Sequence, residues 1–170
     1  LLGGNKMISA ELFQNTMDNL AAKGCFLVTG DKKPNIMTIG WGQVGIMWQK
    51  PIFVVPVRLS RYSHQLMEDV GEFTVCVPSD TSCMSSELAV CGSKSGRDMD
   101  KAKELGLTLV PSKKVKVPNI EQCSMVYECV VRYKLEMTQA NLDEGYVNKW
   151  YPDANYHTLY FGEIVDSYSR

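Results

Sequence analysis

A dense group of anion-binding side chains lies near the end of the first third of the chain. Two guanidiniums and three hydroxyls fall within six positions: Arg58, Ser60, Arg61, Tyr62 and Ser63. A guanidinium presents a rigid fork of N–H donors that matches phosphate oxygens, and hydroxyls complete the shell. A helical pattern begins at Tyr62, so its free backbone N–H groups add to the site. The segment predicts a phosphate site; the alternative is surface pairing of the arginines with Glu68, Asp69 or Glu72.

The residues just before this group are suited to a flat ligand. Apolar and aromatic side chains alternate with glycines at 40, 42 and 45, and include Met37, Ile39, Trp41, Ile46, Met47 and Trp48. Glycine permits a close approach of the backbone, and main-chain groups near Thr38 can hydrogen-bond the polar edge of a ring. A planar ring beside a phosphate site indicates a phosphorylated ring cofactor.

Four motifs together resemble one protein family. They are N-x-M-T-x-x-W-G-x-x-G-x-x-W-x-K-P at 35–51, V-R-x-x-R-Y-S at 57–63, C-G-S-K-S-G-R-D-x-D-K at 91–101 and Y-H-x-x-Y-x-G-E-I at 156–164. In this order they resemble the flavin reductase-like proteins, which include flavoredoxin-type electron carriers. The resemblance implies a mainly β fold with a few helices, the FMN-binding split β-barrel, and FMN as the cofactor.

The resemblance also assigns the cofactor-binding residues. It places Met37, Thr38 and Trp41, with Asn35 at the start of the same strand, against the flavin ring. Strand alternation puts Met37 and Trp41 on one face and Thr38 on the other, so we expect main-chain contacts near Thr38. Trp48 is open to three interpretations: core, dimer interface or flavin contact.

Three further groups join the expected site. Lys94, between Ser93 and Ser95, is open to two interpretations. It contacts the flavin, at the ring's carbonyl edge or at the phosphate, or it is a mobile surface lysine. By resemblance His157 lies near the flavin, where it orients flavin or nicotinamide; it is a candidate, and no residue is assigned as catalytic with certainty. His64 either supports the phosphate site or lies on a helix surface.

The expected activity is an NAD(P)H-dependent flavin reductase or a related FMN oxidoreductase, which passes hydride from NAD(P)H to flavin and electrons onward. The flavin carries the difficult chemistry, so no triad or carboxylate pair is required. The alternatives are a flavoredoxin-type FMN electron-transfer protein served by a protein electron donor, and a flavin-binding module without turnover. The resemblance also implies a homodimer with FMN near the subunit boundary.

Composition limits the remaining possibilities. The 170 residues fit one domain, expected over 7–170, with 1–6 a disordered or cloning-derived N-terminus. A net charge of −1 gives no general attraction to nucleic acid or membrane. Six cysteines without a C-x-x-C pair favour a reduced cytoplasmic setting with no metal site, and Cys91 is open to two interpretations, a small buried residue or a reactive thiol. No apolar run is long enough to span a membrane, and the N-terminus lacks the plan of a signal peptide.

Periodicity and breakers predict the elements that position these residues. We expect helices over 9–23, 62–70, 84–90 and 98–105, with Ser9 as an N-cap and Gly24, Gly71 and Gly106 as stops. Strands are expected over 25–29, from 35 onward, 52–57, 73–77, 115–120, 125–137 and 158–168, with a break at Lys50-Pro51 and a glycine-serine loop over 92–96.

Overall fold

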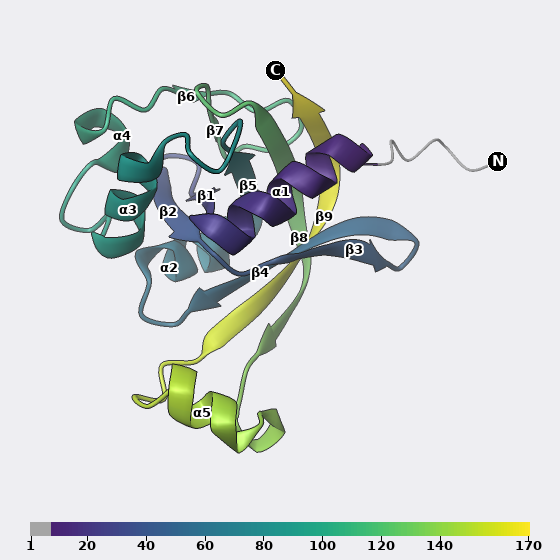
Figure 1. The fold of residues 1–170 in the computed structure, drawn as a ribbon, viewed down its shortest axis with the longest axis vertical. Helices are drawn as coiled ribbons and strands as arrows, with labels where there is room; N and C mark the ends of the chain where they lie inside the picture. Colours follow the sequence, from purple (N-terminus) through teal and green to yellow (C-terminus); the bar gives the residue numbers. More distant parts are fainter. Residues whose placement is uncertain (1–7) are drawn as a thin grey trace.

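A single antiparallel sheet of seven strands forms the centre of the molecule. The computed structural model describes residues 8–170, and the N-terminal segment predicted to be disordered or cloning-derived lies outside them. The strand order is β2-β1-β5-β8-β9-β4-β3 (Figure 1). The strands are β1 (Cys25–Thr29), β2 (Asn35–Ile39), β3 (Gln43–Met47), β4 (Lys50–Arg58), β5 (Glu72–Val77), β8 (Met125–Glu136) and β9 (His157–Ser169). The predicted mainly β fold with a few helices is confirmed.

Within residues 8–170, five α-helices and a small second sheet accompany these strands. The helices are α1 (Ala10–Ala22), α2 (Tyr62–Val70), α3 (Ser85–Ser93), α4 (Lys101–Glu104) and α5 (Glu144–Trp150), with a 3-10 turn at Gln139–Asn141. The second sheet pairs β6 (Leu109–Val110) with β7 (Asn119–Ile120). In Figure 1, α1 crosses the sheet, and α3 and α4 lie together beside β2.

The sheet is buried on both faces at strand β1. Successive strand side chains point to opposite faces, and the two faces of β1 enter two different hydrophobic clusters. Leu27 packs with α1 and with Phe53 and Tyr127 on one face. Phe26 packs with Leu88 of α3 on the other. A continuous apolar run, rather than an alternating one, is therefore what β1 requires.

The helix boundaries show where the sequence signals were sufficient. Ser9 caps α1 by accepting a hydrogen bond from the Leu12 N–H at 3.1 Å, and α2 ends at Gly71, whose φ of 68° is the left-handed conformation that glycine adopts readily. Both predictions are confirmed. The backbone of Arg61 is extended and precedes the first turn of α2, so the helix N-terminus lies beside the arginines.

Four predicted elements have different bounds in the structure. The break in the long stretch lies at Trp48–Gln49, both with positive φ, and Lys50-Pro51 begins β4 instead of separating two strands. The third helix continues through Ser93, so the first two residues of the predicted 92–96 loop are helical. The predicted helix over 98–105 shortens to α4 because Asp100 caps it, accepting from the Lys103 N–H. Of the predicted strand over 115–120, only β7 forms.

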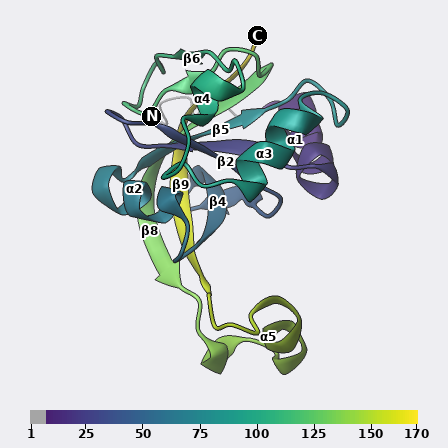
Figure 2. The same ribbon diagram turned by 90° about the vertical axis from the view of Figure 1, so that its left-hand side faces the viewer.

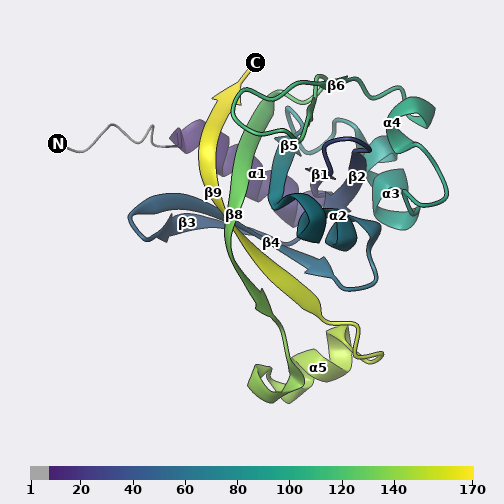
Figure 3. The ribbon, with the colours of Figure 1, turned by 180° about the vertical axis from the view of Figure 1, so that it is seen from behind.

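The paired ends of β8 and β9, with the connection between them, form an arm; β4 pairs with the other edge of β9 as far as His157, so only the connection extends beyond the sheet. Lys134, Leu135 and Glu136 of β8 pair with Tyr160, Leu159 and Thr158 of β9. The arm carries α5 at its end, away from the other helices (Figure 2). Helix α2 packs against β1, β2 and β4 near the base of the arm (Figure 3).

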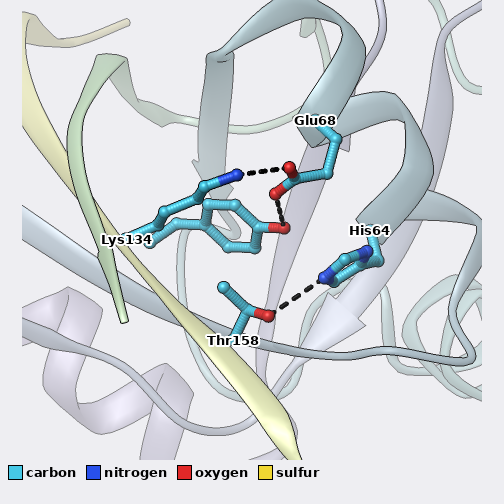
Figure 4. Close-up of polar contacts among 5 residues, drawn as sticks. His64, Glu68, Lys134 and Thr158 are labelled. Carbon is cyan, nitrogen blue, oxygen red and sulfur yellow. Dashed lines mark hydrogen bonds and ion pairs between the residues drawn. The ribbon is translucent and has the colours of Figure 1, made fainter. Parts of the chain in front are cut away.

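Polar side chains hold α2 to this arm. Glu68 accepts hydrogen bonds from the Tyr160 hydroxyl at 2.7 Å and from the Lys134 ammonium (Figure 4). His64 Nε2 lies 3.0 Å from the Thr158 hydroxyl. These hydrogen bonds to Glu68, from Lys134 first, lower the pKa of its carboxyl. Glu68 and His64 therefore bind side chains of the arm. The alternative in which Glu68 pairs with the arginines of the phosphate motif is wrong.

Candidate functional site: two adjoining cavities

A cavity of about 220 Å³ opens where β2 ends and β4 meets β9. The main chain and side chains of residues 37–41 line it, together with Pro56, Arg58, Arg61, Trp150 and His157. Strand β2 ends at Ile39, so the strict alternation expected along 37–41 stops there. Met37, Thr38 and Trp41 all border this one cavity, which we call the ring cavity.

Aromatic side chains from distant parts of the chain form one wall of the ring cavity. The Trp41 ring meets Trp150 edge to face at a centroid distance of 5.2 Å and lies 5.1 Å from the His157 ring. Tyr151 stands behind His157 in an edge-to-face contact at 5.5 Å. Trp150 and Tyr151 were not predicted from the sequence. The only available signal was their position, seven and six residues before His157, in a stretch with no strand pattern.

Arg58 anchors the chain that carries Trp150. Its guanidinium donates to the carbonyl oxygens of Asn155 at 2.7 Å and Trp150 at 2.9 Å, and lies over the Tyr151 ring at 5.1 Å. Helix α5 ends at Trp150, so that carbonyl belongs to a helix C-terminus, where a cation is favoured. The structure therefore places Arg58 at the ring cavity, with two of its donor directions used within the protein.

His157 is held neutral in this setting. Its ring is buried, with 8% exposed, and its Nδ1 lies 2.8 Å from the Tyr151 hydroxyl. Burial, followed by the positive charges of Arg58 and Arg61, lowers the pKa of His157 to about 4. With Nδ1 facing the Tyr151 hydroxyl, the neutral imidazole has its other nitrogen left for a hydrogen bond to a ligand.

A second cavity, of about 300 Å³, collects the hydroxyls and cations of two motifs. Its lining includes Ser60, Arg61, Tyr62, Ser63 and the loop 92–97. The buried Ser63 hydroxyl accepts from Asn35 Nδ2 at 2.9 Å, and the Ser60 hydroxyl accepts from Asn155 Nδ2 at 2.8 Å. Among the described residues 8–170, no side-chain hydrogen bond or ion pair engages Arg61. We call this the phosphate cavity, after the ligand that its donors fit.

A buried lysine forms part of the same cavity. Lys101 is 4% exposed and donates to the carbonyl oxygens of Ile36 at 2.7 Å and Cys91 at 3.0 Å. Burial lowers the pKa of its ammonium, and the positive charge of Arg61 adds to this effect. An ammonium has three donors, so one remains beyond these two carbonyls. Lys101 closes the third family motif, but it was not among the residues expected to bind the cofactor.

The glycine-serine loop closes over the phosphate cavity. Ser93 turns its hydroxyl back to the Ala89 carbonyl at 2.8 Å, while Lys94 is exposed and lines the cavity together with Ser95. Gly96 packs so closely on Asn35 that an added Cβ would lie 1.8 Å from Asn35 Oδ1. Only glycine fits there, which fixes the course of the loop.

Other singled-out residues lie outside the two cavities or turn away from them. Thr38 lines the ring cavity, but its hydroxyl donates to the Leu88 carbonyl at 2.6 Å, so its backbone is what remains for a ligand. Trp48 lies exposed at the tip of the β3–β4 hairpin, which excludes the core interpretation. Cys91 is buried, and burial raises the pKa of its thiol to about 11, in agreement with an inert residue. Across residues 8–170, no group of three or more His, Cys, Asp or Glu side chains is placed to hold a metal.

The two cavities adjoin. Met37 and Arg61 border both, so a ligand with a ring at one end and a phosphate at the other has a continuous lining. The donor set fits that ligand: an aromatic wall and free main chain on one side, cations and hydroxyls on the other. No helix in the described part of the chain is long and apolar enough to cross a membrane.

Comparison with known families assigns the class of protein. Residues 17–170 match the family model described as "Flavin reductase like domain". The chain belongs to this family, and the predicted split β-barrel fold and the resemblance drawn from the four motifs are confirmed. Membership of this family supports a flavin-binding redox function.

Individual relatives extend the comparison. An uncharacterized protein of Archaeoglobus fulgidus is 36% identical over 139 residues, which is 82% of this chain and 67% of that protein. The structure is similar to flavoredoxin of Desulfovibrio vulgaris (Miyazaki F), with 26% identity, a TM-score of 0.68 and coverage of 86% and 69% of the two chains. It is also similar to flavoredoxin from Methanosarcina acetivorans, with 26% identity, a TM-score of 0.69 and coverage of 86% and 68%. The chain thus spans about two thirds of the length of these relatives.

Proposed function

We propose that this protein, as one domain over residues 7–170, binds FMN across the two adjoining cavities and acts as a flavin oxidoreductase that takes hydride from NAD(P)H. The observation that carries the proposal is the shared lining by Met37 and Arg61, which joins an aromatic cavity to one rich in cations and hydroxyls. When bound, FMN accepts two electrons as hydride and releases them to an acceptor. The chain's own groups hold and orient it.

Each part of the lining has a role in this proposal. Arg61, with Lys101, Lys94 and the hydroxyls of Ser60, Ser63 and Ser95, holds the phosphate, while Ser93, whose hydroxyl donates to the Ala89 carbonyl, lines the cavity. Main-chain groups near Thr38 contact the polar edge of the ring. Asn35 fixes Ser63, and Tyr62 stands beside Arg97, whose guanidinium lies 5.1 Å from the Tyr62 ring centroid. Trp41 and Trp150 exclude water from the ring, and neutral His157 orients flavin or nicotinamide.

Arg58 takes a different role from Arg61. Its charge lies near the ring cavity, and its hydrogen bonds go to Trp150 and Asn155. We therefore assign it to holding the aromatic wall in place, while Arg61 contacts the phosphate. A cation close to the polar edge of a flavin stabilises the anionic reduced ring, so Arg58 also favours reduction.

The test is spectroscopic. The purified protein is expected to show flavin absorption, or to gain it after addition of FMN and removal of excess by gel filtration. Anaerobic NADH or NADPH should then bleach the flavin bands of the FMN-loaded protein. No retained flavin would contradict FMN binding. Retained flavin that neither pyridine nucleotide reduces would contradict the reductase.

The second candidate is an FMN electron carrier that accepts electrons from a protein donor. The similarity to two flavoredoxins at 26% identity favours it. A carrier is expected to retain FMN through purification and to be reduced by dithionite but not by NAD(P)H at a useful rate. A flavin-binding module without turnover would retain FMN and pass electrons to no acceptor.

We further propose a homodimer with the flavin near the subunit boundary. Large apolar side chains lie exposed on the β3–β4 hairpin and on the arm. Ile46 of the hairpin is 75% exposed, and the ring centroids of Trp48 and Tyr133 are 6.3 Å apart. An apolar cavity of about 460 Å³, lined in part by Gln43 of β3 and Phe161 of β9, shares Trp41 with the ring cavity. Exposed apolar surface of this kind marks an interaction site.

Sedimentation tests the dimer. Ile46→Glu together with Trp48→Glu places two charges on the hairpin and should convert the protein from dimer to monomer. The matched control, Thr81→Glu, adds a charge at an exposed turn away from the hairpin and should leave the dimer intact. A monomeric unaltered protein would contradict the proposal.

The free thiols of all six cysteines support a reducing, cytoplasmic setting for the protein.

A further inference from the structure

A third cavity lies on the far side of the phosphate cavity from the ring cavity. Its volume is about 590 Å³, and it extends from the β1–β2 turn to α4. It shares five lining residues with the phosphate cavity, namely Asn35, Tyr62, Gly96, Arg97 and Lys101. The three cavities therefore follow one another in the order ring, phosphate and third cavity, which we call the basic cavity.

The partition between the phosphate and basic cavities is thin. Gly96 packs against the Asn35 amide at its buried end. At its exposed end, the Arg97 guanidinium lies over the Tyr62 ring and donates to the Ser60 carbonyl at 3.3 Å. Arg97 is exposed and borders both cavities, so its remaining donors are available to an anion that passes from one to the other.

The charge of the basic cavity favours an anionic ligand. Five basic side chains line it against two carboxylates, and none of the five forms an ion pair within 4.0 Å anywhere in residues 8–170. One of the carboxylates, Asp100, is engaged as the N-cap of α4, where it accepts from the Lys103 N–H at 3.1 Å. The exposed Lys32 and Lys33 stand at the outer end, in the β1–β2 turn.

The same cavity offers apolar surface to a flat ring. Pro34, Met99 and Leu109 contribute to its lining beside the basic side chains. A heterocyclic base needs apolar surface for its faces and polar groups for its edge. A phosphate-linked nucleoside therefore fits this lining better than a free inorganic anion does.

We propose that the basic cavity binds the adenosine monophosphate half of FAD, with Arg97 contacting the diphosphate where it passes between the two cavities. The inference rests on the proposed function, because the FMN half of FAD must occupy the ring and phosphate cavities. FAD is FMN extended by an adenylate at its phosphate, so the extension begins inside the phosphate cavity and leaves it beside Arg97. Lys32 and Lys33 contact the adenylate alone, and no part of FMN reaches them.

A comparison of two flavins tests this assignment. FAD and FMN are titrated separately, by quenching of protein and flavin fluorescence, into the unaltered protein, a Lys32→Ala/Lys33→Ala variant and a Lys113→Ala/Lys114→Ala variant. The last is the matched control, because it removes the same charge from exposed lysines that line none of the three cavities. The Lys32/Lys33 variant should bind FAD about tenfold more weakly and FMN within about twofold of the unaltered protein, since two exposed charge contacts are lost only to FAD. The control should bind both flavins unchanged.

A second measurement does not depend on any variant. Excess 5′-AMP should weaken FAD binding to the unaltered protein and leave FMN binding unchanged, because AMP and FMN occupy different cavities. Equal effects of the Lys32/Lys33 variant on FAD and FMN, or no effect on either, would overturn the assignment, as would an effect confined to the KM for NAD(P)H of the FMN-loaded protein. Failure of the unaltered protein to bind FMN at all would instead remove the proposed function, and this inference with it.

Discussion

The two arginines of the phosphate motif should have separable effects on flavin binding. Arg61 borders the phosphate cavity, and no side-chain partner engages it within residues 8–170, whereas Arg58 donates to the carbonyls of Trp150 and Asn155. Riboflavin lacks the phosphate of FMN. The ratio of FMN to riboflavin affinity therefore isolates the phosphate contact from everything that holds the ring.

The expected magnitudes follow from these contacts. A charge-assisted hydrogen bond contributes about 1.5–3 kcal/mol, so Arg61→Ala should weaken FMN binding by about 2 kcal/mol, or roughly 30-fold, and leave riboflavin nearly unchanged. Arg58→Ala loses two such bonds to the wall around Trp150. It should weaken FMN and riboflavin by the same factor, because both ligands need the ring cavity.

The assay is isothermal titration of each variant with both ligands at physiological salt, where long-range charge effects are screened. Far-UV circular dichroism confirms that each variant is folded. If Arg58→Ala lowers the FMN to riboflavin ratio as strongly as Arg61→Ala does, Arg58 contacts the phosphate and the division of roles is refuted. An unchanged ratio in Arg61→Ala would remove Arg61 from the phosphate site.

Three further predictions concern neighbouring groups. The pKa of His157 is about 4 in the folded protein, below its ordinary 6.5, so the unfolded chain takes up the proton first as pH falls. His157 therefore lowers the free energy of unfolding by up to about 3 kcal/mol between pH 6.5 and pH 4. Urea titrations across this pH range should show a smaller loss of stability in His157→Gln. Gly96→Ala forces a Cβ against Asn35 and should destabilise the protein by about 1–3 kcal/mol in urea, whereas Gly45→Ala, which meets no atom within 4 Å, should be close to neutral. Lys101→Met should reduce the FMN to riboflavin affinity ratio by about tenfold, since one cation near the phosphate is lost; equal losses for both ligands would make Lys101 purely structural.

Local signals were sufficient wherever the deciding interaction is close in sequence. The Ser9 cap, the strand β1 and the Gly71 stop depend on residues within one or two turns, and the structure has them where the sequence predicts. The hairpin turn at Trp48–Gln49 escaped prediction for a physical reason. Both residues adopt positive φ, and neither Trp nor Gln is typical of such a turn.

The site was only partly accessible because its walls come from distant segments. The composition of 35–63 predicts a ring site beside a phosphate site, and the structure has two adjoining cavities along this segment. Trp41 and Trp150 are separated by more than half of the sequence. They meet only because the β8–β9 arm carries α5 to the mouth of the ring cavity. Lys101 reaches the Ile36 carbonyl across 65 positions, and no periodicity distinguishes it from a surface lysine on a short helix. Its burial is a tertiary property.

The most direct test of the account is a crystal structure of the protein with FMN. We predict the isoalloxazine ring in the cavity bordered by residues 37–41, Trp150 and His157, and the phosphate within hydrogen-bonding distance of Arg61 and of the serine-lined loop around Lys94. FMN bound elsewhere, or bound with its phosphate outside the cavity of Arg61, Ser63 and Lys101, would contradict the account.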